Sequence, residues 1–126
     1  MFKLFLDDMR IPSDVFNYIK DPMYLESDWT IVRNYDEFIW AIKEFGIPDV
    51  ISFDHDLADE HYGMQENIEY GFMTEKTGFH CAQWFLYHCI DNKLPVTKRI
   101  YIHSMNPAGA QNIKSLFDSY HKIYGY

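Results

Sequence analysis

The sequence predicts an α/β fold in which helices cover both faces of a doubly wound parallel sheet. Four short apolar runs of strand length alternate along the chain with segments whose apolar residues recur at helical spacing. Strands that alternate with helices pair in parallel through right-handed crossovers. The chain has 126 residues, of which 48% are hydrophobic. A chain of this length can form one hydrophobic core but is too short for two independent cores. We therefore predict a single domain over residues 1–126.

Turn and capping residues indicate where each element begins and ends. The predicted strands are the apolar runs at residues 2–6, 29–33, 49–53 and 99–102. Helices are expected at residues 13–20, 35–45, 78–90 and 107–124. Asn34, Thr77 and Asn106 are suited to cap the last three helices at their starts. Gly46 and Gly125 are suited to end the second and fourth helices.

Residues 58–76 differ in composition from the rest of the chain. They contain Gly63, Gly71 and five acidic residues against a single lysine. A structureless loop of this length is uncommon in a compact domain. We expect either a lid over a site or a segment that contains a short element of its own.

Charge and composition exclude several classes of partner. Eleven Lys and Arg against nineteen Asp and Glu give a net charge of −8, which disfavours binding to duplex DNA or to an anionic membrane surface. Cys81 and Cys89 lack the C-x-x-C spacing of a zinc or redox site. The sequence shows neither a signal peptide nor an apolar run of membrane-spanning length. We expect a cytoplasmic protein with reduced thiols, and its oligomeric state is left open.

Ionisable and polar residues follow three of the four predicted strands. In an open parallel sheet, ligands bind outside the carboxyl ends of the strands, so these residues are expected to form one cluster. Polar strand ends could simply mark the starts of loops, but the second strand ends in an ordinary Arg33-Asn34 pair. The candidate site residues are Asp7, Asp8, Arg10, Asp54, His55, Asp56, His103, Ser104 and Asn106.

Some of these motifs resemble the response-regulator receiver domain. The resemblance is carried by Asp7-Asp8 after the first strand, by residues 48–54 through the third strand and by Ser104 after the fourth. It implies that the acidic pair holds Mg²⁺, that Asp54 accepts a phosphoryl group and that Ser104 contacts that group. The chain departs from the receiver pattern because it lacks the fifth strand and the lysine that follows it.

Three longer strings are more similar to a divergent group, the cyclic-phosphate-processing receiver domains proposed to act in RNA end repair. These strings are residues 6–12, 53–57 and 103–110. The resemblance implies a receiver-like (flavodoxin-like) sheet in the order 2-1-3-4 that lacks the fifth strand. It also implies a phosphodiesterase-type hydrolase acting on a cyclic phosphate. An RNA 2′,3′-cyclic end, a cyclic nucleotide and a sugar phosphate all fit as substrate.

Opening a cyclic phosphodiester needs proton transfer and donors for the phosphate oxygens. His55 and His103 are the expected acid/base pair because imidazole titrates near neutral pH, and Asp54 is grouped with them as catalytic. Arg10, Ser104 and Asn106 are expected to bind the phosphate, the last two at the start of the 107–124 helix. Either histidine could instead be a structural residue. Four further histidines are expected on the surface or on helix faces, namely His61, His80, His88 and His121.

Four carboxylates in one crevice repel one another unless a cation or shared protons offset them. Oxygen ligands favour Mg²⁺ or Mn²⁺, and a histidine ligand would extend the choice to transition metals. Asp54 and Asp8 are the expected direct ligands, and no organic cofactor is expected. The candidate metal ligands are Asp7, Asp8, Asp54 and Asp56.

Two alternatives to this function are kept. Residues 50–56 also fit the Asp-x-Asp strand of a haloacid-dehalogenase-like phosphatase, with Ser104 as its second-motif hydroxyl, but that family's later lysine and acidic pair are absent. The other alternative is a non-catalytic or phospho-accepting receiver-like signalling module, which would not need paired histidines. Such a module could dock through exposed aromatics, although we expect these to lie in the core: Trp40, Trp84, Tyr87 and Tyr124.

Overall fold

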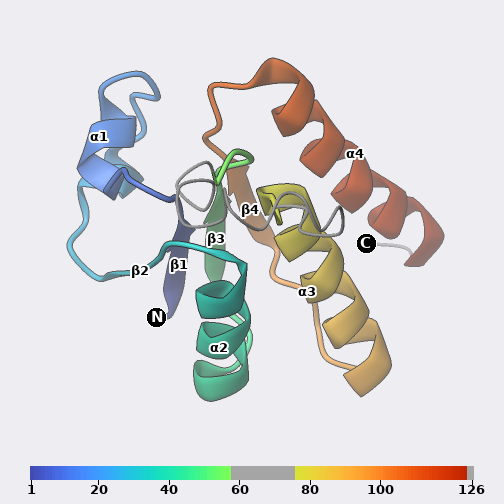
Figure 1. Cartoon of the computed structure of the whole chain (residues 1–126). Coiled ribbons are helices and arrows are strands. Elements are labelled where there is room, and N and C mark those ends of the chain that lie inside the picture. Colours follow the sequence, from blue (N-terminus) through green and yellow to red (C-terminus); the bar gives the residue numbers. More distant parts are fainter. Residues whose placement is uncertain (58–75, 125–126) are drawn as a thin grey trace, which may run out of the picture.

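A computed structural model describes residues 1–57 and 76–124 of the chain (Figure 1). Its strands form one parallel sheet in the order β2-β1-β3-β4, which confirms the predicted order. The strands are β1 (Lys3–Leu6), β2 (Trp29–Val32), β3 (Val50–Phe53) and β4 (Arg99–Ile102). In the register, Leu6 pairs with Val32 and Phe53, and Phe53 pairs with Ile102. The carboxyl ends of β1, β3 and β4 are therefore level.

Helices cover the two faces of the sheet unequally. Figure 1 shows α2, α3 and α4 side by side, with α1 apart from them. The alternate residues Leu4, Leu6, Ile51 and Phe53 join the core cluster that includes residues of these three helices. Phe5, on the opposite face, packs with residues of α1 and η1. The helices are α1 (Pro12–Phe16), the short 3₁₀ helix η1 (Pro22–Leu25), α2 (Tyr35–Phe45), α3 (Gly78–Asn92) and α4 (Pro107–Tyr124).

The first helix is shorter than predicted. It spans only Pro12–Phe16, although a helix over 13–20 is expected from the sequence. The Asp14 side chain accepts a hydrogen bond from the backbone N–H of Ile11 (3.0 Å), which begins the helix one residue earlier. After Phe16 the chain turns, and Pro22 then begins the separate η1 helix rather than ending α1.

Four aromatic residues are expected in the core, and the structure bears this out for only one of them. Trp40, Tyr87 and Tyr124 are 56%, 60% and 51% exposed, so the expectation that they lie in the core is wrong, whereas Trp84 packs partly buried against the core.

The predicted lid at 58–76, His61 and Gly125 lie outside the described residues, apart from Lys76. Within the described part of the chain, no helix has both the length and the apolar character needed to cross a bilayer.

Candidate functional site

The sheet register brings three predicted site residues to the same level. Asp7, Asp54 and His103 each stand one position past the paired residues Leu6, Phe53 and Ile102. Their backbone N–H groups extend the ladder, because Asp54 donates to Leu6 O (3.0 Å) and His103 donates to Phe53 O (2.9 Å). Side chains alternate between the faces of a sheet, so all three lie on the face that Phe5 shares with α1 and η1.

Asp7 is fully buried and accepts several hydrogen bonds. Its Oδ1 accepts from the backbone N–H groups of Met9 (3.0 Å) and Arg10 (2.8 Å). Its Oδ2 accepts from Nε2 of His103 (3.1 Å) and Nη1 of Arg10 (3.3 Å). Burial alone would raise the pKa of Asp7, but the hydrogen bonds from His103 and from the Arg10 and Met9 amides hold that pKa well below its usual range. Asp7 is therefore an ionised carboxylate.

Asp54 is also buried, being only 4% exposed, but it has fewer donors. Its Oδ1 accepts from the backbone N–H of His55 (2.9 Å), and Nη1 of Arg10 lies 3.9 Å from its Oδ2. Burial and the neighbouring Asp7 charge raise the pKa of Asp54 to about 7, despite the opposing effect of Arg10. This carboxyl group can therefore gain or lose a proton near neutral pH.

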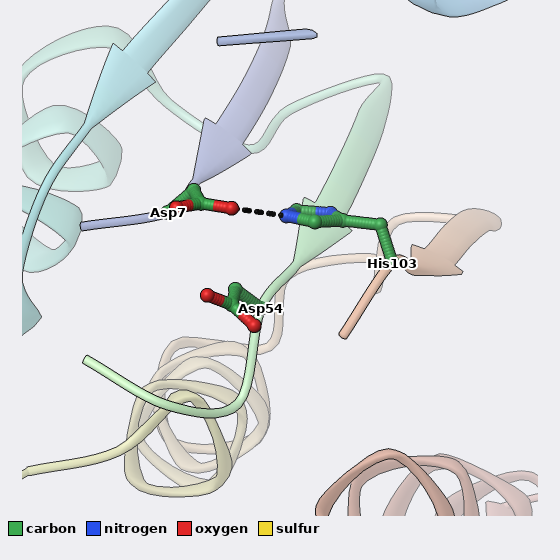
Figure 2. Close-up of side chains that lie close together, drawn as sticks. All are labelled: Asp7, Asp54 and His103. Carbon is green, nitrogen blue, oxygen red and sulfur yellow. Dashed lines mark hydrogen bonds and ion pairs between the residues drawn. The ribbon is translucent and has the colours of Figure 1, made fainter. Parts of the chain in front are cut away.

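His103 lies behind the site rather than at its surface. Its side chain is fully buried, stacked on the ring of Phe5 with 4.6 Å between ring centroids. Figure 2 shows its ring pointing to Asp7, with Asp54 close to both. Its Nδ1 is 2.7 Å from Oγ of Ser52, so both ring nitrogens have hydrogen-bond partners. Burial lowers the pKa of His103, which outweighs the raising effect of Asp7.

His55 lies at the start of α4. Its Nδ1 is 2.8 Å from Oδ1 of Asp56, and Nδ2 of Asn106 donates to the same carboxylate (3.2 Å). The ring packs directly on Gly109, where an added Cβ would come within 2.3 Å of the His55 Cγ. Only glycine allows this approach. Oδ1 of Asn106 caps α4 by accepting from the Gly109 N–H (3.0 Å), and Ser104 Oγ accepts from the Asn106 N–H (3.0 Å).

A cleft of about 230 Å³ opens at the level of Asp54. The Arg10 side chain, 30% exposed, forms part of its wall, and Nη2 of this residue is 3.3 Å from Sδ of Met105. The cleft is lined by Asp8, Met9, Arg10, Asp54, Asp56, Met105 and Asn106. Asp7 and His103 are buried next to it, and His55 and Ser104 lie at its α4 side through their contacts with Asp56 and Asn106. The structure thus brings all nine candidate residues into one region.

The carboxylates suit a divalent cation. Asp7, Asp54 and His103 each offer one ligand atom, and these atoms lie within 4.8 Å of one another. Asp8 lines the same cleft. Asp7 and Asp54 are a buried pair of acids, and the pKa of Asp54 is raised. A bound Mg²⁺ or Mn²⁺ would stabilise the ionised form of both carboxyl groups.

Sequence reasoning missed Ser52 and Tyr24. The hydroxyl of Tyr24 is 2.8 Å from Oγ of Ser52, which in turn contacts His103. Ser52 carried a usable signal, because a hydroxyl inside a buried strand must find a hydrogen-bond partner. Tyr24 carried no such signal, since its neighbours in sequence give no indication of what its hydroxyl meets.

A comparison with protein families decides the relationship. A family described as the cyclic-phosphate processing receiver domain matches residues 2–119. The chain belongs to this family. No curated protein and no solved structure matches the chain. Membership in the cyclic-phosphate processing receiver domains confirms the resemblance seen in the three strings, together with the receiver-like fold, and it connects the chain to cyclic-phosphate processing. It also places the chain with the receivers rather than with the haloacid-dehalogenase-like phosphatases.

Proposed function

We propose that the chain is a phosphodiesterase that hydrolyses a cyclic phosphate bound in the cleft beside Asp54. The observation that carries this proposal is that Arg10 and the start of α4 at Asn106 line the same cleft as Asp54. Arginine and helix amino-termini bind phosphate oxygens. In a chain with a net charge of −8, Arg10 and the start of α4 are the groups that would hold an anionic substrate among the carboxylates of the cleft.

Hydrolysis requires one new bond and two proton transfers. Water attacks phosphorus and loses a proton to a base, while the P–O bond of the ring breaks and its oxygen gains a proton from an acid. We assign the proton transfers to Asp54 and His55. Asp54 titrates near neutral pH at the cleft wall, and Asp56 orients the imidazole of His55 through Nδ1 (2.8 Å). Because both ring nitrogens of His103 are bonded inside the protein, we assign it to holding Asp7.

Asp7, Asp8 and Asp54 would hold a divalent cation in this proposal, with Asp56 at the rim. When bound, Mg²⁺ or Mn²⁺ would offset the carboxylates and polarise a phosphate oxygen. With the cation bound, Asp54 would be ionised and would accept the proton from water, and His55 would donate the proton to the leaving oxygen. Arg10 orients the phosphate in both states, and Ser104 and Asn106 hold the start of α4 in place.

The test is a panel of cyclic phosphates assayed with and without Mg²⁺ and Mn²⁺. The panel contains RNA with a 2′,3′-cyclic end, free cyclic nucleotides and sugar cyclic phosphates, and ring opening is followed by ³¹P NMR. His55→Ala should lower the rate by about 10²–10⁴ if His55 transfers a proton. The matched control is His88→Ala, because His88 stacks on Trp84 on α3. Absence of turnover across the whole panel would contradict the proposal.

A phospho-accepting receiver switch is the second candidate function. It is favoured by the position of Asp54, which directly follows β3 at the cleft. The residues described as lining the cleft include Arg10 but no lysine that could steady a phosphoryl group. Stoichiometric labelling of Asp54 by a small phosphodonor, without turnover of any cyclic phosphate, would favour the switch over the hydrolase.

A further inference from the structure

We infer that Ser52 and Tyr24 are positioning residues of the site, forming a buried relay of hydroxyl groups that holds the hydrogen of His103 on Nε2. In this arrangement His103 donates to Asp7 and is not a metal ligand. The inference concerns how the site is held together. Only an effect of the relay on the rate of hydrolysis would rest on the proposed function.

The relay is a continuous chain of short contacts. The hydroxyl oxygen of Tyr24 is 2.8 Å from Oγ of Ser52, and that Oγ is 2.7 Å from Nδ1 of His103. Nε2 of His103 is 3.1 Å from Oδ2 of Asp7. All four residues are buried, with exposures of 1% for Tyr24 and 0% for the other three. Water therefore does not compete for these hydrogen bonds.

The ionised end of the chain sets the direction of donation. A carboxylate such as Asp7 only accepts, so Nε2 of His103 must carry a hydrogen. In the neutral ring Nδ1 then accepts, which makes the Ser52 hydroxyl its donor. The oxygen of Ser52 in turn accepts from Tyr24, whose hydroxyl keeps its hydrogen because burial raises the pKa of Tyr24 to about 12. Every hydrogen in the relay then has one acceptor.

The other neutral tautomer does not fit the same geometry. A hydrogen on Nδ1 would leave the lone pair of Nε2 facing the lone pairs of Asp7 at 3.1 Å, which is repulsive. The ring cannot turn away easily, because Phe5 stacks on it with an interplanar angle of 4° and Tyr24 meets it edge-on at 6.3 Å. Tyr18 also donates to the backbone carbonyl of His103 (2.7 Å). The packing fixes the position of the ring, and Ser52 completes the choice of tautomer.

The relay also bears on which cations the site can bind. A ring nitrogen that carries a hydrogen cannot coordinate a metal, so His103 is withdrawn from the cluster that it forms with Asp7 and Asp54. Oxygen ligands remain, and these favour Mg²⁺ or Mn²⁺ over Zn²⁺. Removing the Ser52 hydroxyl would release Nδ1 from its donor. The ring could then present Nε2 to a softer cation.

The direct test is the tautomer of His103 in the metal-free protein, read from long-range ¹⁵N–¹H correlations on histidine-labelled samples. A His103→Gln variant assigns the signals. We expect a protonated Nε2 and an unprotonated, hydrogen-bonded Nδ1. Ser52→Ala should shift the Nδ1 signal strongly, Tyr24→Phe should shift it less, and Ser52→Thr should restore it. The control is Ser115→Ala on the exposed side of α4.

A Zn²⁺ titration forms the second arm. Zn²⁺ should leave the His103 nitrogen signals unchanged in the wild-type protein and shift Nε2 in Ser52→Ala. Loss of an outer-shell partner typically costs about 10–100-fold in metal affinity or activity, so Mn²⁺ affinity should fall by a factor in this range. A hydrogen on Nδ1 alone or on both nitrogens in the wild-type protein would overturn the inference, as would Zn²⁺ coordination by wild-type His103. These readouts use no substrate, so they stand apart from the outcome of the hydrolysis panel.

If Ser52→Ala does not fold, the wild-type tautomer and the Tyr24→Phe variant still decide the question. Tyr24→Phe removes one oxygen at the far end of the relay and keeps the ring that packs on Phe5 and Trp29. An Nδ1 signal that is identical in Tyr24→Phe and wild type would show that Tyr24 does not act through Ser52, and the relay would end at Ser52.

Discussion

Asp7 and Asp54 differ in their chemistry although they occupy equivalent places on neighbouring strands. Both are buried, and both stand one residue past the paired positions of β1 and β3. The pKa of Asp7 lies below its usual range, whereas the pKa of Asp54 is raised to about 7. Burial therefore does not decide the protonation state at this edge of the sheet. The hydrogen-bond donors around Asp7 and the charge of Asp7 beside Asp54 do.

The local backbone accounts for the difference in donors. After β1 the chain turns back, so the N–H groups of Met9 and Arg10 both point to Asp7, and His103, directly after β4, adds a further donor. Asp54 receives one backbone N–H, from His55. Two carboxyl groups whose environments separate their pKa values are suited to different roles. Asp7 supplies a fixed negative charge, and Asp54 supplies a group that changes charge.

The largest expected effect is on the activity of Asp54→Asn. If Asp54 transfers a proton or holds a cation in the proposed reaction, its amide should lower kcat by about 10²–10⁴, while the far-ultraviolet circular dichroism stays that of the wild type. The matched control is Asp118→Asn, because Asp118 is exposed and pairs with Lys114 on α4. Wild-type turnover in Asp54→Asn would remove Asp54 from the mechanism.

The comparison between the two carboxyl groups also predicts how stability depends on pH. Asp54 has an ordinary pKa of 3.8 and a folded pKa of about 7. Between these values the unfolded chain is ionised while the folded chain retains the proton, so this group's contribution to stability is full below about 4 and is lost as pH rises to about 7. The loss is up to about 1.4 kcal/mol per pH unit.

The pH prediction is measured as a difference between two proteins. The unfolding free energy of Asp54→Asn minus that of the wild type, from urea titrations, should rise between pH 4 and pH 7 and level off above. Asp7 should behave in the opposite sense, because its pKa is lowered. Its contribution to stability is full above the ordinary pKa of 3.8 and is lost as pH falls below that value. Parallel pH profiles for Asp54→Asn and the wild type would contradict the raised pKa of Asp54.

The sequence was sufficient to predict where this site lies. The strand order and the polar residues after three strands predicted one cluster, and the structure places those residues together. The sequence was also sufficient to predict the bounds of β4. The start and end of α2 could be predicted because Asn34 and Gly46 strongly favour the two ends of a helix. The extent of α1 depended on how the chain turns after Phe16, which local capping residues did not indicate.

The different positions of the two histidines were harder to predict. His103 is the first residue after β4, and His55 is the second after β3, so side-chain alternation sends them to opposite faces. Counting positions from each strand end could have separated them. The partner of His103 in the relay, Ser52, lies 51 residues away in the sequence. Only the assembled sheet places its hydroxyl beside the ring.

A smaller expected effect is on the stability of Asp7→Asn. Asparagine keeps one oxygen, so its amide nitrogen replaces either the acceptor of the Met9 and Arg10 N–H groups or the acceptor of His103 and the Arg10 side chain. A lost hydrogen bond to a charged group is worth about 1.5–3 kcal/mol. We expect Asp7→Asn to lower the unfolding free energy at pH 7 by roughly this amount, measured by urea titration. Asp54→Asn should lower it less or raise it, because it removes a charge that repels Asp7. If Asp54→Asn is the less stable variant, the comparison between the two carboxyl groups is wrong.

The smallest expected effect is the stabilisation by a divalent cation, which tests whether both carboxyl groups act on one ion. A ligand that binds only the folded state stabilises it by RT ln(1 + [L]/Kd), about 1 kcal/mol at ~5 times Kd. Mg²⁺ or Mn²⁺ should therefore raise the Tm of the wild type by a few degrees. The ion should also remove the rise in stability that Asp54→Asn gains over the wild type near pH 7, since a bound cation offsets the repulsion between Asp54 and Asp7. Asp118→Asn should respond to the ion as the wild type does, and an unchanged Tm in the wild type would show that these carboxyl groups do not bind the ion.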